Sequence, residues 1–174
     1  MKIRLIIWLT ISNLFFSSNL SFSQSKFLIN GEPFELPGKW ETKGLIKESG
    51  QYHLYNKKRK LNLLISVRKA QNFEFHNDSL SPRQLLEKWY KWEFDHWSGQ
   101  DVEITRINAD ESKNYILWRL NLKKLEGYNK AIVSTILYFV KNEKLIGINL
   151  NDGSDKNHMS DNEMIKFLED LYKN

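Results

Sequence analysis

The stretch LNLLISVR, residues 61–68, decides the fold. One parity of this stretch carries the apolar residues Leu61, Leu63, Ile65 and Val67, and the other carries Asn62, Leu64, Ser66 and Arg68. Successive side chains of a β-strand point to opposite faces, so the alternation predicts a strand in a sheet with one well-buried face. Because Leu64 has the polar parity, we expect a helix to cover part of the second face as well.

Three further strands are expected before residue 61. Asn30-Gly31 has turn chemistry, and prolines at 33 and 37 limit the segment around Phe34 and Leu36 to a short edge strand, because proline donates no ladder hydrogen bond. The other two predicted strands are Trp40–Lys47, which ends before Ser49-Gly50, and Tyr52–Asn56.

A helix is predicted to begin at Ser81-Pro82-Arg83-Gln84. Serine can cap the free amides of the first turn, proline suits the first helical position, and Gln84 can reach back to the cap. The helix should run from Pro82 to about Trp97 and end at Ser98-Gly99, where glycine tolerates the left-handed conformation.

Four more strands and a second helix complete the expected chain. The strands are predicted at Asp101–Asn108, Asn114–Leu125, Lys130–Val140 and Leu145–Asn151. Their short connections predict an antiparallel meander. Ser160 and Glu163 form a second capping box, and the apolar stripe behind it predicts a helix over residues 160–172.

These elements predict an α+β domain over residues 24–174, with an antiparallel sheet of six to seven strands flanked by two helices. Their order, together with Gly50-x-Tyr52, the run Lys60-Leu61-x-Leu63-x-Ile65 and a glycine-containing strand before the last helix, resembles the PsbP-like family. The resemblance covers about residues 34–172. It implies an α/β/α sandwich that serves mainly to bind other macromolecules, and it transfers no functional residue.

The first 23 residues are predicted to be a signal peptide. Lys2 and Arg4 precede an apolar run from Leu5 to Phe16, and the small residues Ser21 and Ser23 suit a cleavage site after Ser23. A retained membrane anchor is the alternative, but 12 helical residues rise only about 18 Å, less than a hydrocarbon core of about 30 Å. We therefore expect a soluble protein in the periplasm or outside the cell, without a transmembrane segment after cleavage.

Composition limits the possible partners and chemistries. The chain has 174 residues, a net charge of +5 and no cysteine, which excludes disulfides and thiolate chemistry. Removing Lys2 and Arg4 leaves 24 basic and 21 acidic residues, a balance too weak to predict nucleic-acid binding. We expect no cofactor, because no phosphate loop or nucleophile elbow is present, and no metal site, because the four histidines lack metal-ligand spacing.

The helix at 82–97 is unusually aromatic. On a helical wheel Glu93 and His96 fall inside its apolar face, three residues apart, where their side chains can touch. They are weak candidates for an acid–base pair or half of a metal site. We favour instead that one or both are satisfied buried polar groups, or that they reach the rim of the helix beside a partner. Tyr90, Phe94 and Trp97 are candidate binding residues, because tyrosine and tryptophan suit surfaces with one apolar and one wet end.

A basic run at Lys57, Lys58, Arg59 and Lys60 is the second candidate binding feature. It would contact an anionic partner, or else form a solvated turn whose like charges protect a sheet edge from aggregation. The second interpretation fits the small net charge better.

The sequence thus favours an exported binding module without catalytic activity, whose partner is a protein or another envelope component. A hydrolase or metal-assisted enzyme built on Glu93 and His96 is the alternative from a different class. An inhibitor or immunity protein directed against an exported toxin is a narrower form of the binding module.

Overall fold

The structure is a computed structural model that describes residues 24–108, 110, 112–123, 132–152 and 159–173. The predicted signal peptide, the end of the predicted strand Asn114–Leu125 and the start of the predicted strand Lys130–Val140 lie outside the described residues. Neither helix of the described part combines the length and apolar character that crossing a bilayer requires.

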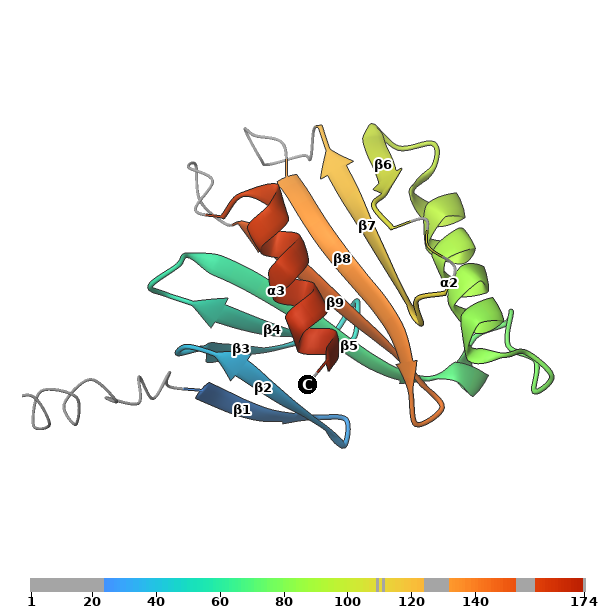
Figure 1. Ribbon diagram of the computed structural model, residues 1–174, viewed down its shortest axis with the longest axis horizontal. Coiled ribbons are helices and arrows are strands. Elements are labelled where there is room, and N and C mark those ends of the chain that lie inside the picture. Colours follow the sequence, from blue (N-terminus) through green and yellow to red (C-terminus); the bar gives the residue numbers. More distant parts are fainter. Residues whose placement is uncertain (1–23, 109, 111, 124–131, 153–158, 174) are drawn as a thin grey trace, which may run out of the picture.

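Seven antiparallel strands form the main sheet, in the order β3-β4-β5-β9-β8-β7-β6 (Figure 1). Their bounds are β3 Glu41–Ile46, β4 Gln51–Asn56, β5 Leu61–Lys69, β6 Val102–Arg106, β7 Tyr115–Leu122, β8 Ile132–Lys141 and β9 Lys144–Asp152. The predicted meander is confirmed as β6 to β9, and β9 pairs with β5 along nine residues. This pairing joins the meander to the hairpins before it.

The N-terminal segment departs from the prediction. Residues Gln24–Ile29 form a strand, β1, that the sequence analysis missed, and it pairs with β2, Glu32–Pro37, in a separate two-stranded sheet. The expected edge strand around Phe34 therefore exists, but it lies outside the main sheet. A two-stranded hairpin has an unpaired side on each strand, which is why it tolerates Pro33 and Pro37.

The two helices cover opposite faces of the main sheet, so the predicted α/β/α sandwich is confirmed. The helix α3, Asp161–Lys173, packs with the β1–β2 hairpin over the face that carries Leu61, Leu63, Ile65 and Val67. The helix α2, Pro82–Trp97, follows the short 3₁₀ helix η1, Ala70–Asn72, and packs over the other face. We call this the α2 face.

The alternation of residues 61–67 correctly predicted which side chains of β5 are buried. All four apolar residues of the first parity are buried, and α2 covers part of the face to which Leu64 belongs. Ser66 of the second parity is also buried, and its hydroxyl donates to the carbonyl of Gly147 on the neighbouring strand at 3.5 Å.

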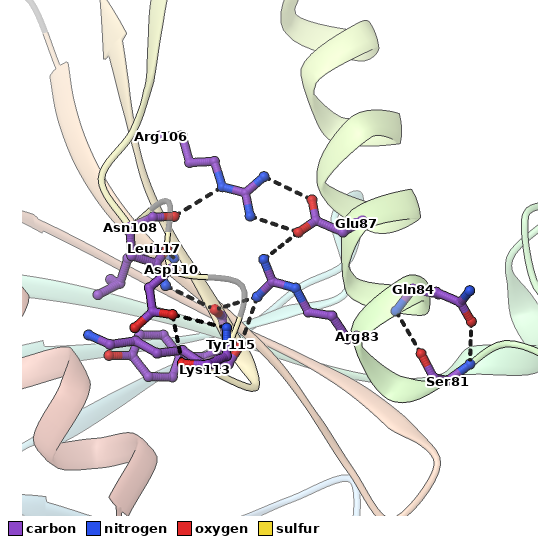
Figure 2. A network of polar contacts seen from close by, with 11 residues as sticks. Ser81, Arg83, Gln84, Glu87, Arg106, Asn108, Asp110, Lys113, Tyr115 and Leu117 are labelled. Atoms are coloured by element: carbon purple, nitrogen blue, oxygen red, sulfur yellow. Dashed lines mark hydrogen bonds and ion pairs between the residues drawn. The ribbon is translucent and has the colours of Figure 1, made fainter.

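Both predicted capping boxes are present. In α2 the Ser81 hydroxyl accepts from the Gln84 amide, and the Gln84 side chain accepts from the Ser81 amide at 2.9 Å (Figure 2). In α3 Ser160 and Glu163 make the corresponding pair of contacts. The helix α2 ends at Trp97, and Gly99 adopts the positive φ expected after its last turn.

Candidate binding site on the second helix

A network of arginines fixes α2 against the edge of the sheet (Figure 2). The Arg106 guanidinium donates two hydrogen bonds to the Glu87 carboxylate, at 2.7 and 2.8 Å, and Arg83 donates a third. Arg106 also lies over the ring of Tyr90, 5.3 Å from its centroid. The hydrogen bond from Arg106 is the largest cause that holds the pKa of Glu87 below its ordinary range. These groups act together as an anchor for the helix.

The burial of α2 is confined to its first half. Its buried residues are Leu85, Leu86 and Trp89, whereas the second half carries the half-buried Trp92, Glu93 and Trp97. His96 is exposed, so the expectation that it lies inside the apolar face is wrong. Trp97, the next residue, still packs toward the sheet, whereas the ring of His96 lies at the border of the packed face against Trp92 and Trp97 and stays exposed.

Glu93 and His96 do not form the pair that their spacing allows. In the described part of the chain no hydrogen bond or ion pair joins them, and no group of three His, Asp or Glu side chains is arranged for a metal. His96 instead contacts the rings of Trp92 and Trp97, at centroid distances of 6.2 and 5.4 Å. Glu93 faces a cavity under the helix.

Two phenylalanines that were not predicted as binding residues lie beside α2. After η1, Phe73 and Phe75 stack with ring centroids 5.0 Å apart, and both rings contact Trp92. Together with His96 and Trp97 they form one continuous, partly exposed array, which we call the aromatic surface. The F-x-F pattern at 73–75 was the available signal, but only the fold shows that it lies beside the helix.

The three predicted binding residues of α2 lie in different environments. Trp97 belongs to the aromatic surface, and Phe94 is 41% exposed. Tyr90 is half-buried and packs edge-on against Trp118, which makes it chiefly a structural contact.

The basic run forms the exposed β4–β5 turn, in which the Asn56 side chain accepts from the Arg59 amide. This turn lies at the opposite side of the molecule from α2 (Figure 1). The two predicted binding features therefore do not share one surface.

The part of the α2 face that lies over β4, β5 and β9 is polar. Its residues include His53, whose ring shares a 2.8 Å hydrogen bond with Asn62, and Asn149, which pairs in register with Leu64. The helix α2 packs on β7 and β8 instead, so this polar half borders the cavity under the helix.

The solved structures that share this fold include the following two proteins. One is the Ran-binding protein Mog1p of Saccharomyces cerevisiae, with a TM-score of 0.55 and 8% identity over 88% of this chain and 94% of Mog1p. The other is the cyanobacterial PsbP, CyanoP, of Synechocystis sp. PCC 6803, with a TM-score of 0.53 and 17% identity over 87% of this chain and 91% of CyanoP. At these identities the likeness shows the fold alone, and the resemblance to the PsbP-like fold is confirmed.

No family model matches the sequence, and no curated protein matches it. The class of the chain is therefore defined by its architecture, an α+β protein with a PsbP-like sandwich.

Proposed function

We propose that this protein is an exported binding module that contacts a protein of the cell envelope through its aromatic surface. The carrying observation is the uninterrupted contact of Phe75, Phe73, Trp92, His96 and Trp97 on one side of the molecule. Each of these five side chains is half-buried or exposed, so each keeps area for a partner. Aromatic side chains are enriched at interfaces because they bury a large area at a small entropic cost.

Charged side chains at the border of the aromatic surface favour a protein partner over a wholly apolar partner. Glu74 is exposed and accepts from the Trp92 indole at 3.3 Å, and Lys91 and Asp95 form an exposed ion pair on the adjacent face of α2. An apolar centre with a polar rim is the usual anatomy of a protein–protein contact.

The N-terminal sequence supports the proposal of export. The fold supports the proposal of a scaffold for binding. The similarity to a Ran-binding protein is compatible with a protein-binding use of this sandwich, although a fold by itself does not fix a function. The basic turn at residues 57–60 lies at the opposite side of the molecule from α2, so we do not include it in the proposed contact (Figure 1).

The test is capture from an envelope extract with the tagged protein and its surface variants. We expect Trp92→Ala and Phe75→Ala to reduce recovery of the partner at least tenfold, because both rings belong to the aromatic surface and are half-buried. Leu28→Ala and Leu45→Ala are matched controls, because these side chains are 74% and 50% exposed and lie elsewhere on the molecule. They should bind as the unchanged protein does.

A variant with glutamine at all four positions of the basic turn separates the two predicted features. It should keep the partner if the aromatic surface is the contact. Loss of the partner in this variant, with normal capture by Trp92→Ala, would move the contact to the basic turn and overturn the proposal.

A further inference from the structure

A cavity of about 110 Å³ lies between α2 and the sheet. Trp89, Glu93 and Trp97 line it from the helix, and Tyr138 and Asn149 line it from the sheet. For comparison, an engineered cavity of about 150 Å³ in a protein core accepts benzene. The cavity therefore suits a molecule somewhat smaller than benzene, of about four or five non-hydrogen atoms.

Two buried hydrogen-bond donors of this cavity have no acceptor in the described part of the chain. They are the indole N–H groups of Trp89 and Trp118, whose side chains are 2% and 0% exposed. The amide oxygen of Asn149, also buried, has no donor among the described residues. Buried polar groups are nearly always paired, because an unpaired one loses its hydrogen bonds to water without replacement.

Opposite charges border the same cavity. The Glu93 carboxylate and the Arg68 guanidinium both line it. Burial is the main reason why the pKa of the Tyr138 hydroxyl lies well above its ordinary value, Glu93 raises this pKa further, and Arg68 lowers it. Both charges therefore act on a hydroxyl inside the cavity. Arg68 also donates to the carbonyl of Ser49, which holds its head group in place.

Residue 147, at the edge of the cavity, is glycine because neighbouring side chains pack directly against it. A Cβ atom there would lie 2.8 Å from the Ser66 hydroxyl, 3.0 Å from the Tyr138 ring and 3.1 Å from the Trp89 ring. Gly147 pairs in register with Ser66 on one side and Tyr138 on the other. Its φ is not in the left-handed region, so the need for glycine here is one of space.

We propose that this cavity binds a small zwitterion of the amino-acid type. The ligand carboxylate accepts from the indole N–H groups of Trp89 and Trp118 and faces Arg68, and the ammonium group donates to Glu93 and to the amide oxygen of Asn149. This assignment gives a partner to each unpaired group and balances both charges. It goes beyond the proposed protein contact and does not depend on it.

The experiment follows the tryptophan indole N–H signals of the mature protein by NMR during titration with glycine and with alanine. Acetate and methylammonium carry the two halves of the ligand separately and serve as matched probes. We expect saturable shifts of the Trp89 and Trp118 signals with at least one amino acid, at a Kd at least tenfold below those of acetate and methylammonium.

Two pairs of variants locate the site. Glu93→Gln should weaken amino-acid binding at least tenfold, and Asp95→Asn, on the exposed face of the same helix, should leave it unchanged. Asn149→Leu should weaken binding likewise, with Asn151→Leu, two residues along the same strand, as its control. Because Glu93 is only half-buried, its variant decides the matter even if Asn149→Leu fails to fold.

Three outcomes would overturn the proposal. Absence of a saturable shift with any probe means that none of these molecules reaches the two indole groups. Equal affinity for acetate and the amino acids means a simple anion site. Unchanged binding in Glu93→Gln places the amino acid elsewhere.

Discussion

The indole ring of Trp89 stacks face to face on the phenol ring of Tyr138, with centroids 3.9 Å apart and planes 9° apart. This contact seats α2 on β8, because Trp89 comes from the middle of the helix and Tyr138 from the strand below it. Trp118 of the neighbouring strand then meets Tyr138 edge-on at 5.6 Å. Gly147 allows the stack, since a Cβ there would lie within 3.1 Å of both rings.

Replacing Trp89 by alanine should reduce the free energy of unfolding by about 3–5 kcal/mol, the usual cost of truncating a buried aromatic residue. Trp92→Ala is the matched control, because Trp92 lies three residues along the same helix and is only half-buried. It should cost less than half as much. Urea denaturation followed by far-ultraviolet circular dichroism gives both values, and equal losses would contradict the packing described for α2.

The ion pair between Glu87 and Arg106 should make stability depend on pH. The Arg106 guanidinium holds the pKa of Glu87 below its ordinary range in the folded protein. A carboxyl whose pKa is lowered by folding stabilises the protein fully above its unfolded pKa of about 4.3, and this contribution is lost as the pH falls through the folded pKa.

The measurement is the difference in unfolding free energy between the unchanged protein and Glu87→Gln, taken from pH 7 down to about pH 3. We expect about 1 kcal/mol at neutral pH, since the Glu87 side chain is 37% exposed and solvent screens its charge. The difference should shrink below about pH 4.3. A difference that stays constant over this range would show that Glu87 contributes by packing alone.

The buried Glu32 ties the β1–β2 hairpin to the main sheet. Its carboxylate is 2.7 Å from the Lys144 ammonium group, which also donates to the carbonyl of Asn30. Asn30 in turn donates to the carbonyl of Val67 at 2.9 Å. Lys144→Met should destabilise the protein by about 3 kcal/mol, because it leaves a buried carboxylate without its ion-pair partner.

The double variant Glu32→Gln with Lys144→Met removes both charges and should recover part of this loss. A double-mutant cycle from chemical denaturation measures the coupling between the two residues. If the two single losses simply add, the pair does not connect the hairpin to the sheet.

Export is tested at the N-terminus. Expressed in a bacterium, the protein should be recovered from the periplasm or medium with Gln24 as its first residue. Ser23→Tyr should block processing, because the residue before the cut must be small. Phe22→Leu is the control and should be processed normally. Recovery of secreted protein that begins at Met1 would refute the predicted cleavage site.

The sequence by itself determined the features that depend on neighbours in the chain. The alternation of residues 61–67 fixed both the strand and its buried side, since a strand has a period of two. The start of each helix was also predictable, because a capping box joins two residues that are only three positions apart. The two capping boxes are Ser81 with Gln84 and Ser160 with Glu163. Short connections determined that β6 to β9 form an antiparallel meander.

Only the tertiary structure decided which elements meet. Strands β5 and β9 lie far apart in sequence, and no local pattern records that they pair. The β1–β2 hairpin lies apart from the main sheet. Its residues Ile29 and Leu36 pack in the core between the main sheet and α3, and its Glu32 forms an ion pair with Lys144. Helical spacing placed Glu93 and His96 on one face, but Glu93 lines the cavity under α2 whereas His96 is exposed at the border of the packed face. Helical periodicity says which residues share a face, and only the packed neighbour decides which part of that face is buried.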